Sequence, residues 1–211
     1  MESTTGNEII FSSRDRKNDK DDRSSGLKEI NGSGLDDNTG LGINVEDKGG
    51  VVSVRQLRKM NSPDVTIQVP KGIVVYYEYE SQYGGEVKMK NLENEIEISA
   101  NYNSVELENI TGPVTARVVY GHVEADFQSN LKGPISIVSV YGYVDVAMSP
   151  ATKANIRMST SYGELYASPE FKIDMDKGFA DEETKVSGKL NGGGITIDLN
   201  SNYGKVYLRK K

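Results

Sequence analysis

The stretch Tyr141-Gly142-Tyr143-Val144-Asp145-Val146 is one copy of a phrase that recurs along the chain. Each copy has a tyrosine, then glycine or asparagine, then two apolar residues, each preceded by a variable one. Further copies begin at Tyr102, Tyr120, Tyr162 and Tyr203, and a looser copy with one inserted residue begins at Tyr83. Counted from the glycine or asparagine at positions 85, 103, 121, 142, 163 and 204, the steps are 18, 18, 21, 21 and 41 residues. A fixed period of roughly 20 to 50 residues is typical of stacked repeats.

Apolar residues also alternate upstream of each tyrosine. The residues that stand six positions before it are Ile96, Val114, Ile135, Ile156 and Ile197. Strict alternation indicates a strand with one buried face, so each unit is predicted to be a strand, a corner and a second strand. The glycine is expected to supply a corner conformation that is closed to most residues, with Asn103 as the next best substitute.

Two architectures are compatible with these units, a β-solenoid and an antiparallel meander. A meander would favour Asn-Gly or Asp-Gly at its tight turns, and this chain has Tyr-Gly there. We therefore predict an all-β fold, a single-stranded β-helix or β-solenoid-like stack of two-strand rungs of roughly 20 residues. Val105, Val123 and Val144 are then expected to lie side by side in one buried ribbon, each rung contacting only its neighbours.

The chain is expected to form one β-solenoid domain over residues 1–211, with the regular repeats at 83–208. Residues 13–40 are polar and rich in charge, which predicts a long flexible loop. Residues 168–191 form an acidic insertion that accounts for the doubled last step. Strands are also predicted near 8–11, 64–70 and 72–79, with a hairpin around 47–50.

Composition excludes several classes of function. The net charge of −6 argues against sequence-independent nucleic-acid binding, because phosphate contacts need a basic surface. The chain has no cysteine, which removes disulfides, thiolate metal sites and a cysteine nucleophile. No window approaches about 18 consecutive apolar residues, so no transmembrane segment is predicted. No cofactor is expected.

Several stretches together resemble the putative-adhesin family of β-strand-repeat proteins, a domain of unknown function common in bacterial cell envelopes. The resemblance covers roughly residues 36–211, and its clearest segments are 37–46, 65–70, 107–114, 149–154, 188–194 and 207–211. It implies a β-helix-like fold and an extracytoplasmic location, in the periplasm or at the cell surface, and carries no established catalytic residues. The N-terminus lacks a signal sequence, as a mature secreted chain would.

The first candidate site is a column of corner tyrosines, namely Tyr83, Tyr102, Tyr120, Tyr141, Tyr162 and Tyr203. A purely structural interpretation is a stack of rings that covers a corner, with the hydroxyls toward water. A functional interpretation is an aromatic strip that binds glycan or a partner surface. The exposed Tyr143, Tyr166 and Tyr207 extend the candidate surface.

The second candidate is the outward column that carries Lys88, Glu106, Glu124, Asp145, Tyr166 and Tyr207. Three carboxylates on successive rungs would repel each other, which predicts a solvated face or, alternatively, a bound divalent cation. His122 is the only histidine and is expected on the surface beside Glu124. No serine-histidine-acid group follows from the sequence, so no catalytic residue or metal ligand is assigned.

Three functions remain open from these patterns. The first is a non-enzymatic envelope protein that presents a β surface to a glycan or an envelope protein. The second is a polysaccharide-binding or polysaccharide-active β-helix, which would need a concave outer face with at least two convergent acidic residues for catalysis. The third is an architectural module whose ends pair in a larger assembly.

Overall fold

The computed structural model describes all residues except 14–22, 24–26, 28–31, 58–62, 84 and 176–183. The chain divides into two compact units, one of Met1–Glu8 with Val69–Lys211 and one of Ile9–Gln68, where a single domain over 1–211 is expected from the sequence. Most of 13–40, the predicted flexible loop, lies outside the described residues. None of the described residues forms a helix that is long and apolar enough to cross a bilayer.

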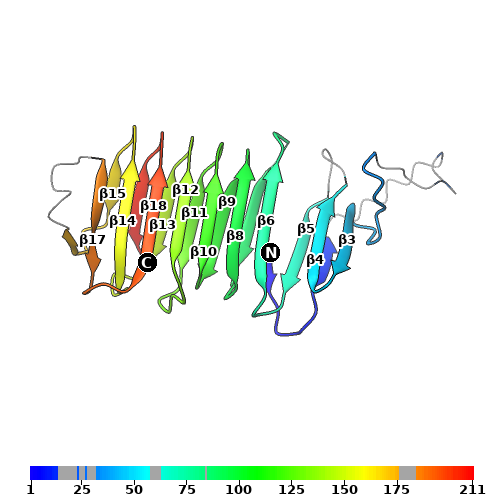
Figure 1. Ribbon diagram of the computed structural model, residues 1–211, viewed down its shortest axis with the longest axis horizontal. Helices are drawn as coiled ribbons and strands as arrows, with labels where there is room; N and C mark the ends of the chain where they lie inside the picture. The colour runs from blue at the N-terminus through cyan, green and yellow to red at the C-terminus, as the bar shows by residue number, and fades with distance from the viewer. Residues whose placement is uncertain (14–22, 24–26, 28–31, 58–62, 84, 176–183) are drawn as a thin grey trace. The chain divides into compact units, whose positions relative to one another are not determined.

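The larger unit consists of two sheets whose strands lie side by side (Figure 1). The first sheet contains β1 (Glu2–Ser3), β7 (Glu86–Lys90), β9 (Ser104–Ile110), β11 (Val123–Phe127), β13 (Val144–Met148), β15 (Leu165–Ala167) and β19 (Val206–Lys210). The second sheet contains β6 (Val74–Glu80), β8 (Glu95–Asn101), β10 (Val114–Val118), β12 (Ile135–Ser139), β14 (Ala154–Thr160), β16 (Ile173–Met175), β17 (Lys185–Leu190) and β18 (Ile195–Ser201).

Successive rungs pair in parallel, as a solenoid requires and a meander does not. In the second sheet, Val114 of β10 pairs with Ile96 on one side and Ile135 on the other. In the first sheet, Val123 pairs with Val105 and with Val144. These three valines are at most 1% exposed, which confirms the predicted apolar ribbon between the sheets. The predicted all-β solenoid is therefore confirmed.

The order of the rungs in space differs from their order in the chain. The second sheet runs β16-β17-β14-β18-β12-β10-β8-β6, and the first runs β15-β19-β13-β11-β9-β7-β1 within this unit. The last rung, β18 and β19, thus lies between the rung of β12 and β13 and the rung of β14 and β15. Ile197 shows this directly, because it pairs with Ile135 and with Ile156.

The predicted insertion at 168–191 is in part regular structure. β17 pairs antiparallel with β14, and β16 pairs antiparallel with β17. Phe171, which precedes β16, is buried with 7% exposure. The insertion therefore adds two strands beside β14 in the second sheet, while most of its acidic part, at 176–183, lies outside the described residues.

The smaller unit contains two antiparallel pairs. Its strands are β2 (Ile10–Ser13), β3 (Ile43–Lys48), β4 (Val51–Gln56) and β5 (Val65–Val69). The last residue of β5, Val69, already belongs to the larger unit. β3 pairs with β4 around Gly49 and Gly50, which confirms the predicted hairpin. The strand predicted near 8–11 is β2, which begins two residues later than expected and pairs with β5.

Candidate functional site

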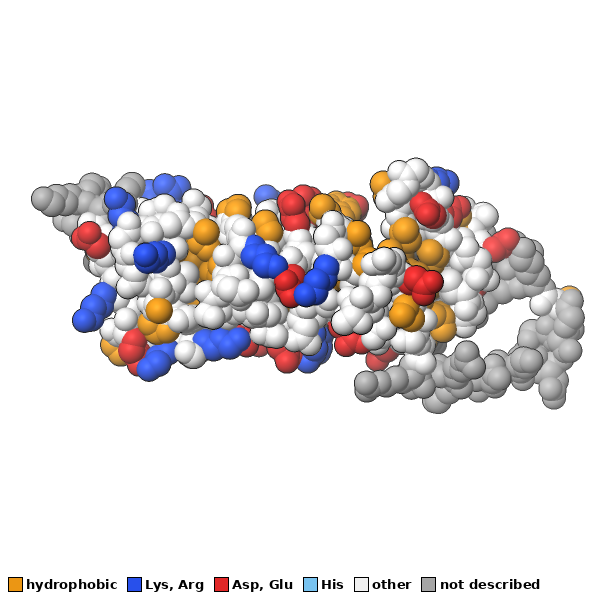
Figure 2. Space-filling view, turned by 90° about the horizontal axis from the view of Figure 1, so that it is seen from below, with side chains coloured by type: hydrophobic (Ala, Val, Ile, Leu, Met, Phe, Trp, Pro, Cys, Tyr) orange, Lys and Arg blue, Asp and Glu red, His pale blue; other side chains and the backbone are white. Residues whose placement is uncertain are grey.

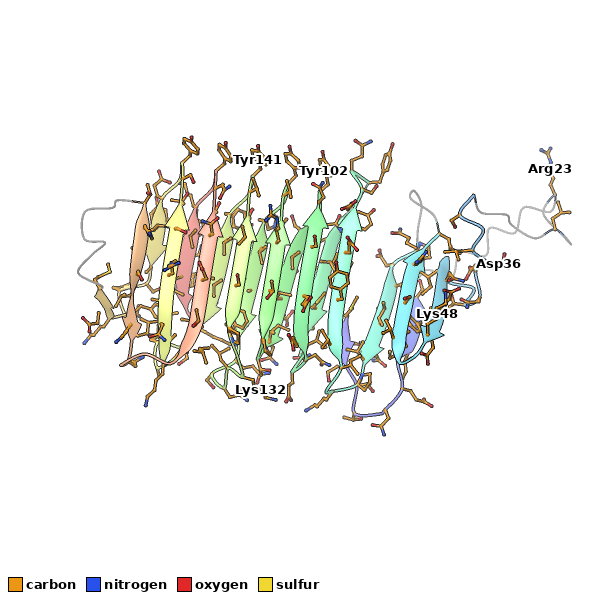
Figure 3. All side chains as sticks on the ribbon, in the orientation of Figure 1. Arg23, Asp36, Lys48, Tyr102, Lys132 and Tyr141 are labelled. Carbon is orange, nitrogen blue, oxygen red and sulfur yellow. The ribbon has the colours of Figure 1, made fainter. Side chains whose placement is uncertain are left out.

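Five tyrosine rings form a continuous stack at one edge of the solenoid, here called the tyrosine ladder. In spatial order the ladder is Tyr102, Tyr120, Tyr141, Tyr203 and Tyr162. Neighbouring ring centroids are 4.8 Å apart, or 5.0 Å for the last pair, and neighbouring planes differ by at most 15°. Tyr102 and Tyr141 are labelled at this edge in Figure 3. The spacing equals that of adjacent strands, so the ladder follows directly from the parallel stacking of the rungs.

Backbone hydrogen bonds hold the corners in register beneath these rings. The amide of Tyr141 donates to the carbonyl oxygen of Val119 at 2.9 Å, and the amide of Tyr203 donates to that of Val140 at 3.0 Å. The rings remain between 46% and 75% exposed, and Tyr162, at one end of the ladder, is the most exposed. The ladder therefore presents aromatic edges to solvent while its inner ring faces cover one another.

The corner glycines serve close packing and not an unusual backbone conformation, which corrects the expectation from the sequence. Gly121, Gly142, Gly163 and Gly204 do not have the positive φ that only glycine tolerates readily. A Cβ at Gly142 would lie 2.0 Å from the carbonyl oxygen of Gly121 in the neighbouring rung. At the Tyr102 corner the left-handed residue is the tyrosine itself, with φ of 65°, and not Asn103.

Buried hydroxyls join the same corners. The side chain of Ser139 donates to the carbonyl of Gly121 at 2.8 Å, and that of Ser201 donates to the carbonyl of Gly142 at 2.6 Å. Thr160 completes the row with a bond of 2.9 Å to the carbonyl of Gly204. Each hydroxyl thus satisfies a carbonyl of the preceding rung in space.

Tyr83 does not belong to the ladder. Within the described part of the chain it makes no ring contact, although it was predicted to start the column. The cause is the inserted residue in the first copy of the phrase, which places Tyr83 in a turn after β6. Asn103 instead contacts β6, since its amide donates to the hydroxyl of Tyr77 at 2.8 Å.

The predicted outward column of the first sheet is confirmed by the strand register. Lys88 pairs with Glu106, Glu106 with Glu124, and Glu124 with Asp145. Asp145 is followed by Tyr207 and then by Tyr166, because the last rung is inserted here. The rings of Tyr166 and Tyr207 stack with centroids 5.4 Å apart.

Each carboxylate of this column has its own partner. Lys88 forms an ion pair with Glu106, and Arg209 Nε lies 2.7 Å from Asp145 Oδ1. The hydroxyl of Tyr143 donates to Glu124 at 2.5 Å. Burial, together with this negative neighbour, raises the pKa of Tyr143 to about 12. Among the described residues no group of three acidic or histidine side chains is placed to hold a metal ion.

His122 lies in the chain between Tyr120 of the ladder and Glu124 of this column. Its ring stacks on that of Tyr143 with centroids 4.5 Å apart, and its Nδ1 lies 3.0 Å from Ser104 Oγ. The serine-histidine contact was not predicted, and the equal phase of the two residues in their repeats is the signal that would have found it. In the described part of the chain no carboxylate is hydrogen-bonded to His122, so the pair lacks the third member of a catalytic triad.

The edge opposite the ladder is charged. Lys132 is labelled at this edge in Figure 3, and Figure 2, seen from below, shows basic and acidic side chains beside each other. Glu93 contacts Lys132 at 2.5 Å and Lys71 at 2.6 Å. These two ammonium groups, Lys132 first, lower the pKa of Glu93 to about 2. The aromatic edge is therefore distinct in chemistry from its opposite.

Two hollows lie on the outer face of the second sheet, and the sequence did not reveal them. The first, of about 430 Å³, is lined by Ser136, Val138, Arg157, Ser159, Thr160, Ser161, Lys185, Asp198 and Asn200. The second, of about 350 Å³, is lined by Asn155, Ile156, Arg157, Ser187, Gly188, Lys189, Thr196 and Asp198. Asp198 is the single carboxylate in both linings.

These features define a β-solenoid repeat protein with an aromatic ladder along one edge. The chain belongs to the Toastrack DUF4097 family, whose model matches residues 83–209. The resemblance to a β-repeat family of unknown function is thereby confirmed. A solved structure from Clostridium sporogenes, described as a putative cell adhesion protein, is 14% identical with a TM-score of 0.44, covering 80% of this chain and 76% of its own. Comparison with the curated proteins finds no matching relative.

Proposed function

We propose that this protein is a non-enzymatic binding or scaffold protein of the bacterial cell envelope that acts outside the cytoplasm. The observation that carries the proposal is the tyrosine ladder, a rigid row of exposed aromatic edges along the solenoid. The rungs beneath it are fixed by backbone bonds at Tyr141 and Tyr203 and by the buried Ser139 hydroxyl. A ligand therefore meets a preorganised surface, which lowers the entropic cost of binding.

The geometry of the ladder favours an extended partner. The inner rings cover each other's faces, so a sugar ring has no open face to stack on except at the ends, such as Tyr162. The phenol edges recur at every rung with the spacing of 4.8 to 5.0 Å between ring centroids. A glycan chain or an envelope protein segment that runs along the solenoid axis would meet one phenol at each step.

Two observations support binding over catalysis on polysaccharide. Glycosidase chemistry needs two carboxyl groups on either side of the scissile bond. In the part of the chain that the structure describes, Asp198 is the one carboxylate that lines either hollow. Among the described residues, no acidic side chain is hydrogen-bonded to His122 to orient the imidazole.

The proposal is tested by co-sedimentation with purified peptidoglycan sacculi and by binding to a glycan array. The variant Tyr120→Ser combined with Tyr141→Ser removes two inner members of the ladder. Tyr76→Ser is the matched control, because Tyr76 is 58% exposed but lies on β6 away from the ladder. We expect saturable binding that the double variant loses and the control retains.

Other outcomes would overturn the proposal. Absence of saturable binding to every glycan, sacculus and envelope fraction would remove the binding role. Release of reducing ends from a polysaccharide panel by the purified protein would show that it is an enzyme. Fractionation of the producing cells tests the location, and recovery in the cytoplasm alone would contradict the extracytoplasmic assignment.

A further inference from the structure

The outer face of four adjacent strands, β12, β18, β14 and β17, forms a second surface, on the opposite sheet from the outward acidic column. Strand register aligns its outward side chains in rows. One row contains Ser136, Asp198, Arg157 and Ser187, and another contains Val138, Asn200, Ser159 and Lys185. A third contains Thr196, Asn155 and Lys189. The surface exists only because β18 is inserted beside β14 and β17 adds an antiparallel strand.

The two hollows on this face share two lining residues, and together they are here called the polar groove. Both are lined by Arg157 and Asp198, which lie side by side on β14 and β18. The hollow of about 430 Å³ extends from this pair toward Lys185, and the hollow of about 350 Å³ extends toward Lys189. The polar groove therefore offers space on both sides of the pair formed by Arg157 and Asp198.

The charge of the polar groove is opposite to that of the whole chain. Arg157, Lys185 and Lys189 stand against the single carboxylate Asp198, whereas the chain carries a net charge of −6. Within the described residues neither Arg157 nor Lys189 forms an ion pair, although Asp198 and Asp174 are their respective neighbours in register. Arg157 and Lys189 have no ion-pair partner among the described residues of an acidic molecule, and such cations point to an anionic ligand.

The remaining lining consists of hydroxyl and amide groups. The amide of Asn200 donates to Ser159 Oγ at 2.8 Å, and that of Asn155 donates to the carbonyl of Gly194 at 2.9 Å. These bonds orient both side chains and leave the hydroxyls of Ser136 and Thr196 on the same face. Such a lining suits a ligand that carries many hydroxyl groups.

We propose that the polar groove binds a segment of an acidic polysaccharide, with sugar carboxylates at Arg157 and Lys189. Sugar hydroxyls then contact the serine, threonine and asparagine side chains. An acidic peptide fits less well, because among the described residues of the lining only Val138 and Ile156 are large and apolar. β12, β18 and β14 each have a strand neighbour on both sides, so these three strands offer no free edge to pair with a peptide backbone.

Calorimetry with tetragalacturonate tests the proposal, with a neutral galactose tetramer and tetraglutamate as comparison ligands. We expect tetragalacturonate to bind and the other two to bind at least about tenfold more weakly. Arg157→Gln should weaken binding about tenfold, since it removes a charge-assisted contact. Asp198→Asn should strengthen binding, and a gain of affinity cannot arise from misfolding.

Arg117→Gln is the matched control, because Arg117 of β10 pairs in register with Val138 of β12 but does not line the groove. An equal loss of affinity in this variant would reduce the effect to general charge and overturn the site. Preference for tetraglutamate, or no binding of tetragalacturonate, would also overturn it. The groove is independent of the tyrosine ladder, so the Tyr120→Ser and Tyr141→Ser variant should keep tetragalacturonate binding even where sacculus binding is lost.

Discussion

Tyr203 stacks on Tyr141 with ring centroids 4.8 Å apart and planes 9° apart, although Tyr162 lies between them in the chain. Tyr162 stacks on the other side of Tyr203 at 5.0 Å. The C-terminal rung is therefore an internal layer of the solenoid. Its core residues Ile197 and Leu199 have no measurable exposure and are covered by neighbours on both sides.

This position predicts a specific pattern of hydrogen exchange. The amides of β18 should exchange as slowly as those of β12, because they open only with the core of the stack. The amides of β15, a three-residue strand at the end of the first sheet, should exchange much faster. Exchange measured by NMR or mass spectrometry on peptides that cover residues 165–167 and 195–201 checks this prediction.

Stacking in chain order would give the opposite result. The rung of β18 and β19 would then be terminal and would fray, whereas β15 would be an internal strand. Leu199→Ala offers an independent check, since removal of a fully buried leucine costs roughly 2–5 kcal/mol of unfolding free energy. Leu165 of β15, which is partly exposed, is the control, and its replacement by alanine should cost clearly less.

The sequence predicts which residues share a column but not their order along it. Val105, Val123 and Val144 occupy equal phases of the repeat, so their contact follows from the period alone. Ile156 and Ile197 occupy the same phase as Ile135, and either could have been its neighbour. The choice depends on how the chain between them folds, and β16 and β17 carry no copy of the repeated phrase.

For the outward column, too, the sequence predicts the alignment of the residues but not all of their contacts. Alternation predicts correctly that Glu106, Glu124 and Asp145 point outward on successive rungs. It does not predict that Lys88, Tyr143 and Arg209 satisfy their charges, because those contacts depend on side-chain rotamers and on the inserted rung. The polar groove was not predicted, because β17 pairs with β14 in the antiparallel direction and is not part of the repeat.

Close packing at the corners makes Gly142→Ala strongly destabilising. The added methyl group would lie 2.0 Å from the carbonyl oxygen of Gly121, which is backbone and has little freedom to move. We expect a loss of roughly 3 kcal/mol or more in unfolding free energy, at the upper end of overpacking effects. Denaturant unfolding followed by circular dichroism measures the change.

Gly85→Ala is the matched control for this prediction. Gly85 occupies the equivalent position in the first, looser copy of the phrase, and a Cβ there would meet no atom within 4 Å. Its replacement should change stability by less than about 0.5 kcal/mol, as at ordinary surface positions. Similar losses in both variants would show that the glycines act through backbone conformation and not through packing.

The buried hydroxyl row predicts a smaller effect for Ser139→Ala. The change leaves the carbonyl of Gly121 without its bond of 2.8 Å in a site where Ser139 has no measurable exposure. Loss of such a partner costs about 1–3 kcal/mol. Denaturant unfolding checks the value against Ser99→Ala, an exposed serine of β8, which should be neutral within experimental error. An equally neutral Ser139→Ala would contradict the role of the hydroxyl.

The contact between Tyr143 and Glu124 predicts a dependence on alkaline pH. The pKa of Tyr143 is raised to about 12, first by burial and then by Glu124, whereas the pKa of a tyrosine in the unfolded chain is about 10. The folded state binds this proton more tightly, so the contribution to stability is complete below pH ~10 and is lost as pH rises from there toward the folded pKa.

Glu124→Gln should lower the pKa of Tyr143 only part of the way, because burial remains. NMR titration of the tyrosine rings, assigned with Tyr143→Phe, measures this, and Glu106→Gln should leave the pKa of Tyr143 unchanged, since Glu106 pairs with Lys88 instead.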